Sequence, residues 1–365
     1  MAARRETNFA TILAAARGLA LFIAILWHVD ISMDVFFPGY KVHEVTFKVL
    51  WFFPLPTFFL FLGLSFSNII AREKIGIISN SVSYYLYLYA IWALLYHILF
   101  AVFGREVHEF GLVPALKHFL FPAPELWFVG WMAFCLFICT ATRNMLKLSC
   151  LLISIAWILL LDSPGYSIKN FMIYNLIFVY IGIIFRERII RIFELPSGPV
   201  ITFCLPLYGL IAYFNIPHIA FSMPLPSIAA SLIGITLAIH ILKACRNYSG
   251  PRMLADVGRR AFHLYLVAPG WIFTDCKLIQ TINAHWLALT PDQIGSLTLP
   301  VCLLVMGQSL MTISLLGSKS FLLKAPSIIQ TRASRAVARL LVLCSWSKSS
   351  LVNSSPLVER SNDVN

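Results

Sequence analysis

The chain alternates between long apolar runs and short, mostly basic connectors. Apolar runs of about twenty residues are long enough to cross the hydrocarbon core of a bilayer as helices. Ten such segments are predicted, near residues 9–29, 51–70, 82–103, 125–142, 148–162, 168–185, 199–215, 226–243, 257–274 and 296–316. The pattern therefore predicts an all-α integral membrane protein of about ten transmembrane helices.

Composition supports this class. Of the 365 residues, 59% are hydrophobic and 12% are charged, whereas about 25% of the residues of an ordinary soluble domain are charged. The net charge is +12, but the basic residues are spread over short connectors and form no continuous patch. A nucleic-acid partner is therefore not expected.

The placement of the basic residues predicts an orientation. If ten helices alternate in direction, most of the 28 Lys and Arg residues fall on one side of the membrane. Cytoplasmic loops carry this excess in membrane proteins, so both termini are predicted to be cytoplasmic. An alternative is that residues 1–29 form a cleaved signal peptide. Arg17 interrupts the apolar region and no suitable cleavage site follows it, so a retained first span is favoured.

The predicted membrane domain covers residues 1–317, and residues 318–365 form a predicted cytoplasmic tail. Within the tail, residues 325–343 place Arg332, Arg335 and Arg339 on one helical face. A basic amphipathic helix of this kind suits an anionic inner leaflet, which makes membrane lipids expected partners. The polar end of the tail is predicted to be disordered.

The eight cysteines suggest neither a disulfide framework nor a metal site. No Cys-x-x-Cys pair occurs, and His and Cys never cluster at ligand spacing. No metal and no bound cofactor are expected.

The first apolar segment contains two ionisable residues, in the stretch ARGLALFIAILWHVD (residues 16–30). Arg17 and His28 are eleven residues apart, so on a helix they project from the same face and are separated by about 16 Å of rise. Ionisable groups within a membrane normally face a protein interior or a water-filled cavity. If the span begins at Gly18 instead, Arg17 is a cytoplasmic anchor whose side chain reaches the headgroups. The spacing alone leaves both interpretations open.

The segment ARGLALFIAILWH (16–28) resembles the opening motif of membrane acyltransferase family 3: an arginine, ten mostly apolar residues, and a histidine. Four further pieces resemble the family's motifs in the same order: PLPTFFLFLGLSFS (54–67), ELWFVGWMAF (125–134), IYNLIFVYIGIIF (173–185) and VGRRAFHLYLVAP (257–269). The likeness runs along residues 10–316. Leu62 and Ala268 depart from the usual serine and histidine, and only Arg72 and Lys74 stand where many members carry an arginine pair.

This resemblance implies a membrane O-acyltransferase of the bacterial inner membrane, a transferase of groups other than aminoacyl groups. The donor would be cytoplasmic acyl-CoA, most plausibly acetyl-CoA, acting as substrate. The acceptor would be a hydroxyl of a surface or secreted carbohydrate, such as an exopolysaccharide or a lipid-linked glycan. O-acetylation of a polysaccharide is the expected outcome.

Residue roles follow from this expectation. Arg17 would bind a CoA phosphate or polarise the thioester carbonyl, and Arg72 and Lys74 would be further cofactor contacts. His28 would act as general base on the sugar hydroxyl or would carry the acyl group as a covalent intermediate. Both routes stay open. Glu125 is a candidate to orient His28, and Trp127 is a candidate surface for stacking on sugar; an interfacial carboxylate and an aromatic belt are the ordinary alternatives.

Two other classes of function remain open. A transporter of glycans or small molecules would also have many spans and few charges, although such proteins usually show repeated halves and none is evident in this sequence. A degenerate family member acting only as a membrane scaffold is the other alternative. An acyltransferase adds a base-labile ester to its cargo, whereas a transporter leaves its cargo unchanged.

Overall fold

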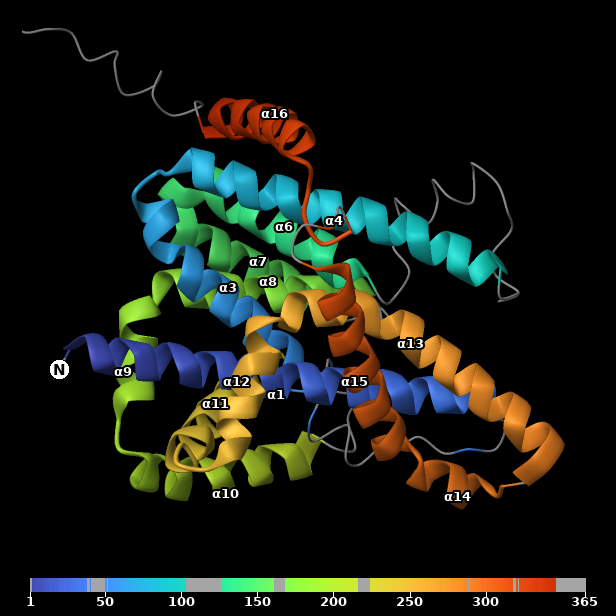
Figure 1. Cartoon of the computed structure of the whole chain (residues 1–365). Helices are drawn as coiled ribbons and strands as arrows, with labels where there is room; N and C mark the ends of the chain where they lie inside the picture. Colours follow the sequence, from blue (N-terminus) through green and yellow to red (C-terminus); the bar gives the residue numbers. More distant parts are fainter. Residues whose placement is uncertain are drawn as a thin grey trace, which may run out of the picture.

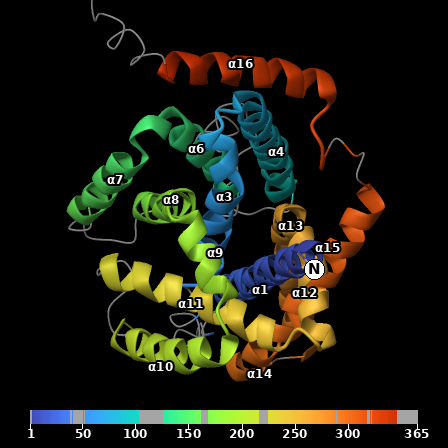
Figure 2. The ribbon, with the colours of Figure 1, turned by 90° about the vertical axis from the view of Figure 1, so that its left-hand side faces the viewer.

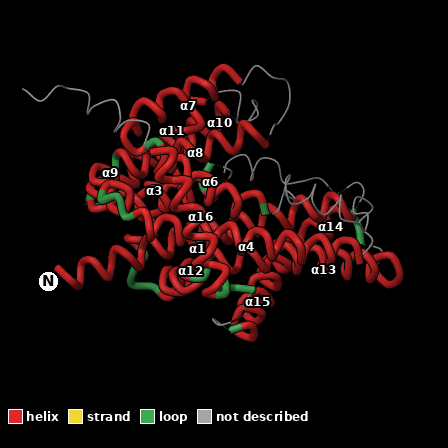
Figure 3. Tube along the Cα trace, turned by 90° about the horizontal axis from the view of Figure 1, so that it is seen from above, coloured by secondary structure: helices red, strands yellow, loops and turns green. Residues whose placement is uncertain are grey.

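The fold is all-α across the residues that the structure describes, which are 2–37, 40, 50, 52–102, 126–160, 168–215, 224–287, 289–317, 320 and 322–345 of a computed structural model. Helices make up nearly all of this part of the chain, and it contains no strand (Figure 3). The α-helices are α1 (Ala2–Phe36), α3 (Pro54–Ala71), α4 (Ile75–Val102), α6 (Trp127–Ala141), α7 (Leu146–Leu160), α8 (Ile168–Ile184), α9 (Arg186–Glu194), α10 (Ser197–Asn215), α11 (Pro224–Ala244), α12 (Ser249–Arg259), α13 (Ala261–Ile282), α14 (Pro291–Ser296), α15 (Thr298–Leu316) and α16 (Ser327–Ser345).

Helix α1 is the central element of the bundle. It packs against α12, α13, α3, α15 and α11, and Figure 2, which looks from the side of its N-terminus, shows these helices around it. Helices α3, α4, α6, α7 and α8 form the upper part of Figure 1, with α16 lying across α4. A central helix must be apolar on most of its faces, and residues 14–16, 20 and 21 of α1 are almost fully buried.

Several helices are long and apolar enough to cross a membrane. Six of the described helices meet this criterion: Phe9–Phe36, Pro54–Ala71, Ile75–Leu99, Ser197–Phe214, Pro226–Ala244 and Pro291–Leu316. A seventh span is possible if the pair Trp127–Ala141 and Arg143–Ile155, bent by 70°, counts as one. The chain thus has the build of an all-α, multi-pass membrane protein.

Each of the ten predicted segments coincides largely with a helix, but two details differ. The predicted segment 257–274 is divided at Arg260, because the amphipathic α12 ends there and the apolar α13 begins at Ala261. The segments 125–142 and 148–162 are joined by a short 3₁₀ turn, Arg143–Met145, at the 70° bend. The total of ten spans and the cytoplasmic termini remain predictions.

Glycines allow backbone contact at two helix crossings, α1 with α12 and α3 with α8. A Cβ on Gly18 of α1 would lie 2.0 Å from the Leu254 carbonyl oxygen of α12, and one on Gly258 of α12 would lie 1.7 Å from the Ala14 oxygen. In the same way, a Cβ on Gly63 of α3 would lie 2.2 Å from the Val179 oxygen of α8. Small residues allow such backbone contact between membrane helices, where dispersion rather than burial from water holds the helices together.

The periphery of the bundle is apolar. On α10, Phe203 is 69% exposed and Tyr213 is 70% exposed, and α15 carries Leu303, Leu304 and Leu315 in comparable positions. Large apolar side chains at this density are costly in water and suit lipid contact.

Helix α16 occupies most of the range in which the tail helix is expected, residues 325–343, and its Ser334 contacts Ser79 of α4 through a 3.0 Å hydroxyl–hydroxyl hydrogen bond. Residues 346–365, where a disordered end is predicted, lie outside the described residues.

Candidate functional site

Arg17 lies in the middle of the bundle on one continuous helix. Its neighbour Gly18 packs directly on α12, while Arg17 itself interacts electrostatically with Tyr85 of α4. The Arg17 Nε atom is buried and has no hydrogen-bond acceptor among the described residues. A buried, permanently charged donor without an acceptor is costly, so this N–H is suited to an anionic or carbonyl ligand.

His28 lies against an aromatic wall. Its ring centroid is 6.3 Å from that of Tyr265 of α13 and 5.1 Å from that of Trp27, both in edge-to-face arrangements. The Tyr265 ring in turn lies 4.9 Å from Phe128 of α6. The histidine therefore lies where α1, α6 and α13 meet.

The two residues are held on one rigid element. Helix α1 runs unbroken from Ala2 to Phe36, and the candidate span Phe9–Phe36 includes both Arg17 and His28. An uninterrupted helix separates them by about 16 Å of rise on nearly the same face. They cannot contact the same reacting carbonyl, so each must have a different role.

Asp30, two residues after His28, is bonded to a residue beyond the end of α1. Its fully buried carboxylate accepts a hydrogen bond from the Tyr40 hydroxyl, which also lies 3.3 Å from the Thr298 hydroxyl. Burial, followed by the hydrogen bond to Asp30, raises the pKa of Tyr40. This cluster ties the segment after α1 to the start of α15.

Arg72 and Lys74 lie on the exposed turn between α3 and α4. Glu73, between them, adopts a left-handed conformation (φ 52°) and forms a 3.2 Å ion pair with Arg143 of the α6–α7 turn. No hydrogen bond or ion pair joins Arg72 or Lys74 to Arg17 within the described part of the chain. The structure therefore places these two predicted contacts on a surface turn apart from Arg17.

Trp127 is a wall residue. It is 6% exposed and stacks on Phe59 of α3, with a centroid distance of 6.5 Å and an interplanar angle of 19°. Because stacking on a sugar requires an open ring face, this geometry favours a packing role for Trp127. Glu125, the other predicted substrate contact, lies outside the described residues.

A short segment before α16, residues 322–325, crosses α4 and is called here the C-terminal strap. The Trp92 indole donates to the Leu322 carbonyl at 2.8 Å, and the Tyr84 hydroxyl donates to the Leu323 carbonyl at 3.0 Å. His263 Nε2 of α13 lies 3.0 Å from the same hydroxyl. A phenol has one proton and a carbonyl can only accept, so His263 donates to Tyr84. Leu323 is 4% exposed, so the strap is packed against the bundle where Tyr84 of α4 meets His263 of α13.

Removing both hydrogen bonds to the strap should loosen it. The double variant Trp92→Phe/Tyr84→Phe loses two bonds that contribute about 1 kcal/mol each. We expect amide exchange of the strap to rise by about 30-fold, measured by hydrogen–deuterium exchange with mass spectrometry. Trp131→Phe is the matched control, because it removes an indole bond to the Met172 carbonyl elsewhere in the bundle. Equal exchange in both variants would show that these bonds do not hold the strap.

Two residues beside Arg17 and His28 are missing from the predicted site: Tyr265, whose ring lies 6.3 Å from that of His28, and Tyr85, which interacts electrostatically with Arg17. A signal for Tyr85 existed, since Tyr84, Tyr85, Tyr87 and Tyr89 form an unusual run at the start of an apolar segment. Tyr265 lies in the motif segment VGRRAFHLYLVAP (257–269), but its place beside His28 follows only from the packing of α13 on α1.

No family model, curated protein or solved structure matches this chain. The described residues also contain no group of three or more His, Cys, Asp and Glu that could hold a metal ion.

Proposed function

We propose that the protein is an integral membrane O-acyltransferase, most plausibly an O-acetyltransferase, which moves an acyl group from cytoplasmic acyl-CoA to a hydroxyl of a surface or secreted carbohydrate. Its place would be the bacterial inner membrane, with both termini in the cytoplasm. The resemblance of residues 16–28 to the opening motif of membrane acyltransferase family 3 supports this proposal.

The observation that carries the proposal is the arrangement of α1. One central helix holds a buried guanidinium with an unsatisfied N–H and, about 16 Å further along the same face, an imidazole. A helix that only anchors the bundle has no need for either group, because each is costly at this depth.

The proposed reaction is direct transfer. The acceptor hydroxyl oxygen attacks the thioester carbonyl carbon while His28 removes the hydroxyl proton. The tetrahedral intermediate collapses, the C–S bond breaks, and the CoA thiolate takes the proton from His28. The products are a sugar ester and free CoA, and His28 returns to its neutral state.

Arg17 has a separate role in this scheme. Because it is too far from His28 to touch the same carbonyl, we assign it to a phosphate of CoA, which a guanidinium binds with two parallel hydrogen bonds. The extended pantetheine arm of CoA can bridge the distance between a phosphate at Arg17 and a thioester at His28. Tyr265 and the aromatic residues behind it then shield the acceptor end from bulk water.

A transfer assay tests the proposal. Membrane vesicles that contain the full chain, supplied with [¹⁴C]acetyl-CoA and the host's glycan, should incorporate label that mild base releases. We expect incorporation at least 10-fold above vesicles that lack the protein, because positioned general-base catalysis contributes about 100-fold or more.

Two other results of this assay would contradict parts of the proposal. Movement of radiolabelled glycan across the vesicle membrane, without formation of an ester, would contradict the enzymatic function and support a transporter. Label found on His28 of the acid-quenched protein would contradict direct transfer and support an acyl-histidine intermediate.

A further inference from the structure

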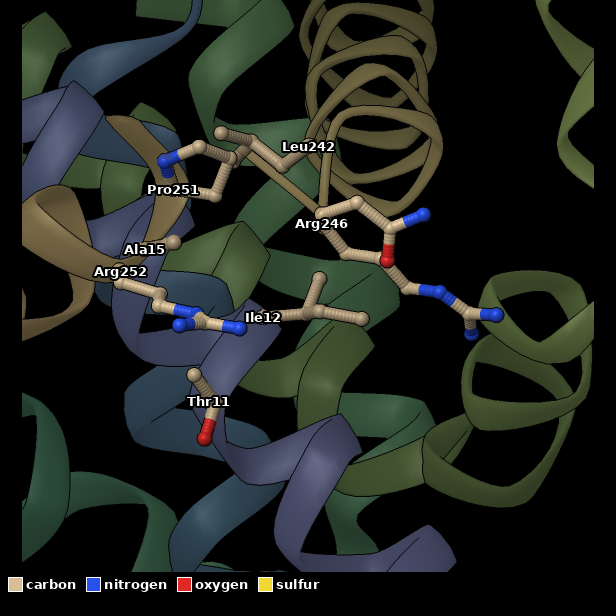
Figure 4. Close-up of a pocket in the computed structure, with 8 residues that line it drawn as sticks. Thr11, Ile12, Ala15, Leu242, Arg246, Pro251 and Arg252 are labelled. Atoms are coloured by element: carbon tan, nitrogen blue, oxygen red, sulfur yellow. The ribbon is translucent and has the colours of Figure 1, made fainter. Parts of the chain in front are cut away.

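A cavity of about 450 Å³ lies between α1, the end of α11 and the start of α12. Thr11 and Ile12 of α1 form one side, and Arg246, Asn247 and Arg252 approach from the other elements. In Figure 4 the Arg252 side chain lies near Ile12 and Thr11, whereas the Arg246 side chain points outward on the other side of Ile12. The cavity is therefore polar at its rim and apolar where Ile12, Leu242 and Pro251 line it.

The two cavity arginines carry uncompensated charge. Within the described residues neither Arg246 nor Arg252 forms an ion pair. The acidic group of α12, Asp256, is paired with Arg259, and Lys243 is directed at the carbonyls of residues 193–195. Among the described side chains, the cavity thus holds two guanidinium groups without a carboxylate partner, and guanidinium groups bind phosphate as a bidentate acceptor.

This cavity is distinct from the Arg17 site. Ala15 lines it, and Arg17 is two residues further along α1, which turns its side chain about 200° away. The face between them is occupied by α12, which contacts Gly18 through backbone atoms. A ligand in the cavity therefore does not reach Arg17, and its binding does not depend on the proposed acyl transfer.

We propose that this cavity binds a phosphoryl group at the membrane surface, through Arg246 and Arg252, with the Asn247 amide and the Thr11 hydroxyl beside it. The positive-inside distribution puts this end of α1 at the cytoplasmic surface. Basic pockets between membrane helices at that level take anionic headgroups, and the apolar lining accommodates the adjoining glycerol and acyl carbons. Two sources present the same chemistry: an anionic phospholipid and a soluble polyphosphate. Both arginines are exposed, so their side chains can rotate to bind one phosphate together.

Binding to the purified full chain tests the proposal. The probes are dioctanoyl phosphatidylglycerol for the lipid source and inorganic pyrophosphate for the soluble source, each titrated by thermal shift in a non-ionic detergent. The variant is Arg246→Gln/Arg252→Gln. The control is Arg188→Gln/Arg191→Gln on α9, which removes the same charge from exposed positions away from the cavity lining.

We expect the cavity variant alone to bind one probe at least 10-fold more weakly. A loss confined to phosphatidylglycerol identifies a headgroup site, and a loss confined to pyrophosphate identifies a soluble-phosphate site. Equal losses in both double variants, or no loss in either, would overturn the proposal, because binding would then follow overall charge or occur elsewhere.

Discussion

Adding one methyl group at Gly258 should unfold or severely destabilise the bundle. A Cβ in Gly258→Ala would lie 1.7 Å from the Ala14 carbonyl oxygen and 2.8 Å from the Gly18 nitrogen. Both are backbone atoms of the central helix and cannot rotate away. Helices α1 and α12 must therefore separate, and overpacking of this kind costs about 3 kcal/mol or more. Thermal unfolding in detergent, followed by fluorescence-detected size exclusion, measures the loss.

Gly307→Ala is the matched control. Gly307 is also in a helix, α15, and an added Cβ there meets no atom within 4 Å. This variant should be neutral or stabilised by about 0.5–1 kcal/mol, because alanine favours helix more than glycine does. A melting temperature of Gly258→Ala equal to that of the control would show that α1 and α12 do not cross this closely.

A double variant checks that the effect arises at the crossing. Gly18→Ala acts on the same contact, since its Cβ would lie 2.0 Å from the Leu254 oxygen. Once the helices have parted, the second methyl group adds little, so Gly18→Ala/Gly258→Ala should cost clearly less than the sum of the single variants. Additive losses would indicate two independent sites of strain.

The fold class could be predicted because long apolar runs separated by basic connectors are the pattern that a bilayer requires of membrane-spanning helices. The break at Arg260 could not be predicted, because residues 257–260 continue the apolar pattern only in part. The end of α12 at this point goes with the packing of Gly258 against α1, which the sequence does not reveal. The 70° bend between α6 and α7 lies at a turn whose Arg143 pairs with Glu73 of the α3–α4 turn, a contact between distant parts of the chain that the sequence does not reveal.

The candidate site shows the same division. The spacing of Arg17 and His28 predicts one face of one helix because helix geometry is local. Their surroundings are not local: Tyr85 comes from α4 and Tyr265 from α13, and both are brought to α1 by the bundle. The same holds for Trp127, whose position in an aromatic sequence indicates an interface but whose ring is covered by Phe59 of a different helix.

The segments that resemble family motifs supply residues to the close helix crossings and to the surroundings of His28. In VGRRAFHLYLVAP, Gly258 brings α12 against α1, and Tyr265, seven residues later, lies beside His28. Gly63 and Gly182, from two further segments, meet at the α3–α8 crossing. The first crossing holds α12 against the central helix that carries Arg17 and His28, and the second joins α3 to α8.

Replacing Arg17 or His28 should impair acyl transfer in different ways. His28→Ala removes the proposed general base, so we expect kcat to fall about 100-fold or more while KM for acyl-CoA changes little. Arg17→Met removes the proposed phosphate contact, so KM for acyl-CoA should rise by about 10- to 100-fold. Arg17→Lys keeps the charge but loses the planar fork, and should fall between wild type and Arg17→Met.

His240→Gln is the control for the loss of a buried histidine. The His240 ring is bonded to the Ile192 carbonyl at 3.1 Å and lies 3.4 Å from the Ser197 hydroxyl, so it supports α9 and α10. Its replacement should lower stability and leave the rate per folded molecule unchanged. If Arg17→Met lowers kcat and leaves KM unchanged, the proposed role of Arg17 would change from binding the donor phosphate to polarising the thioester carbonyl. Normal turnover in His28→Ala would exclude His28 as the base, and the unsatisfied Arg17 N–H would then need another explanation.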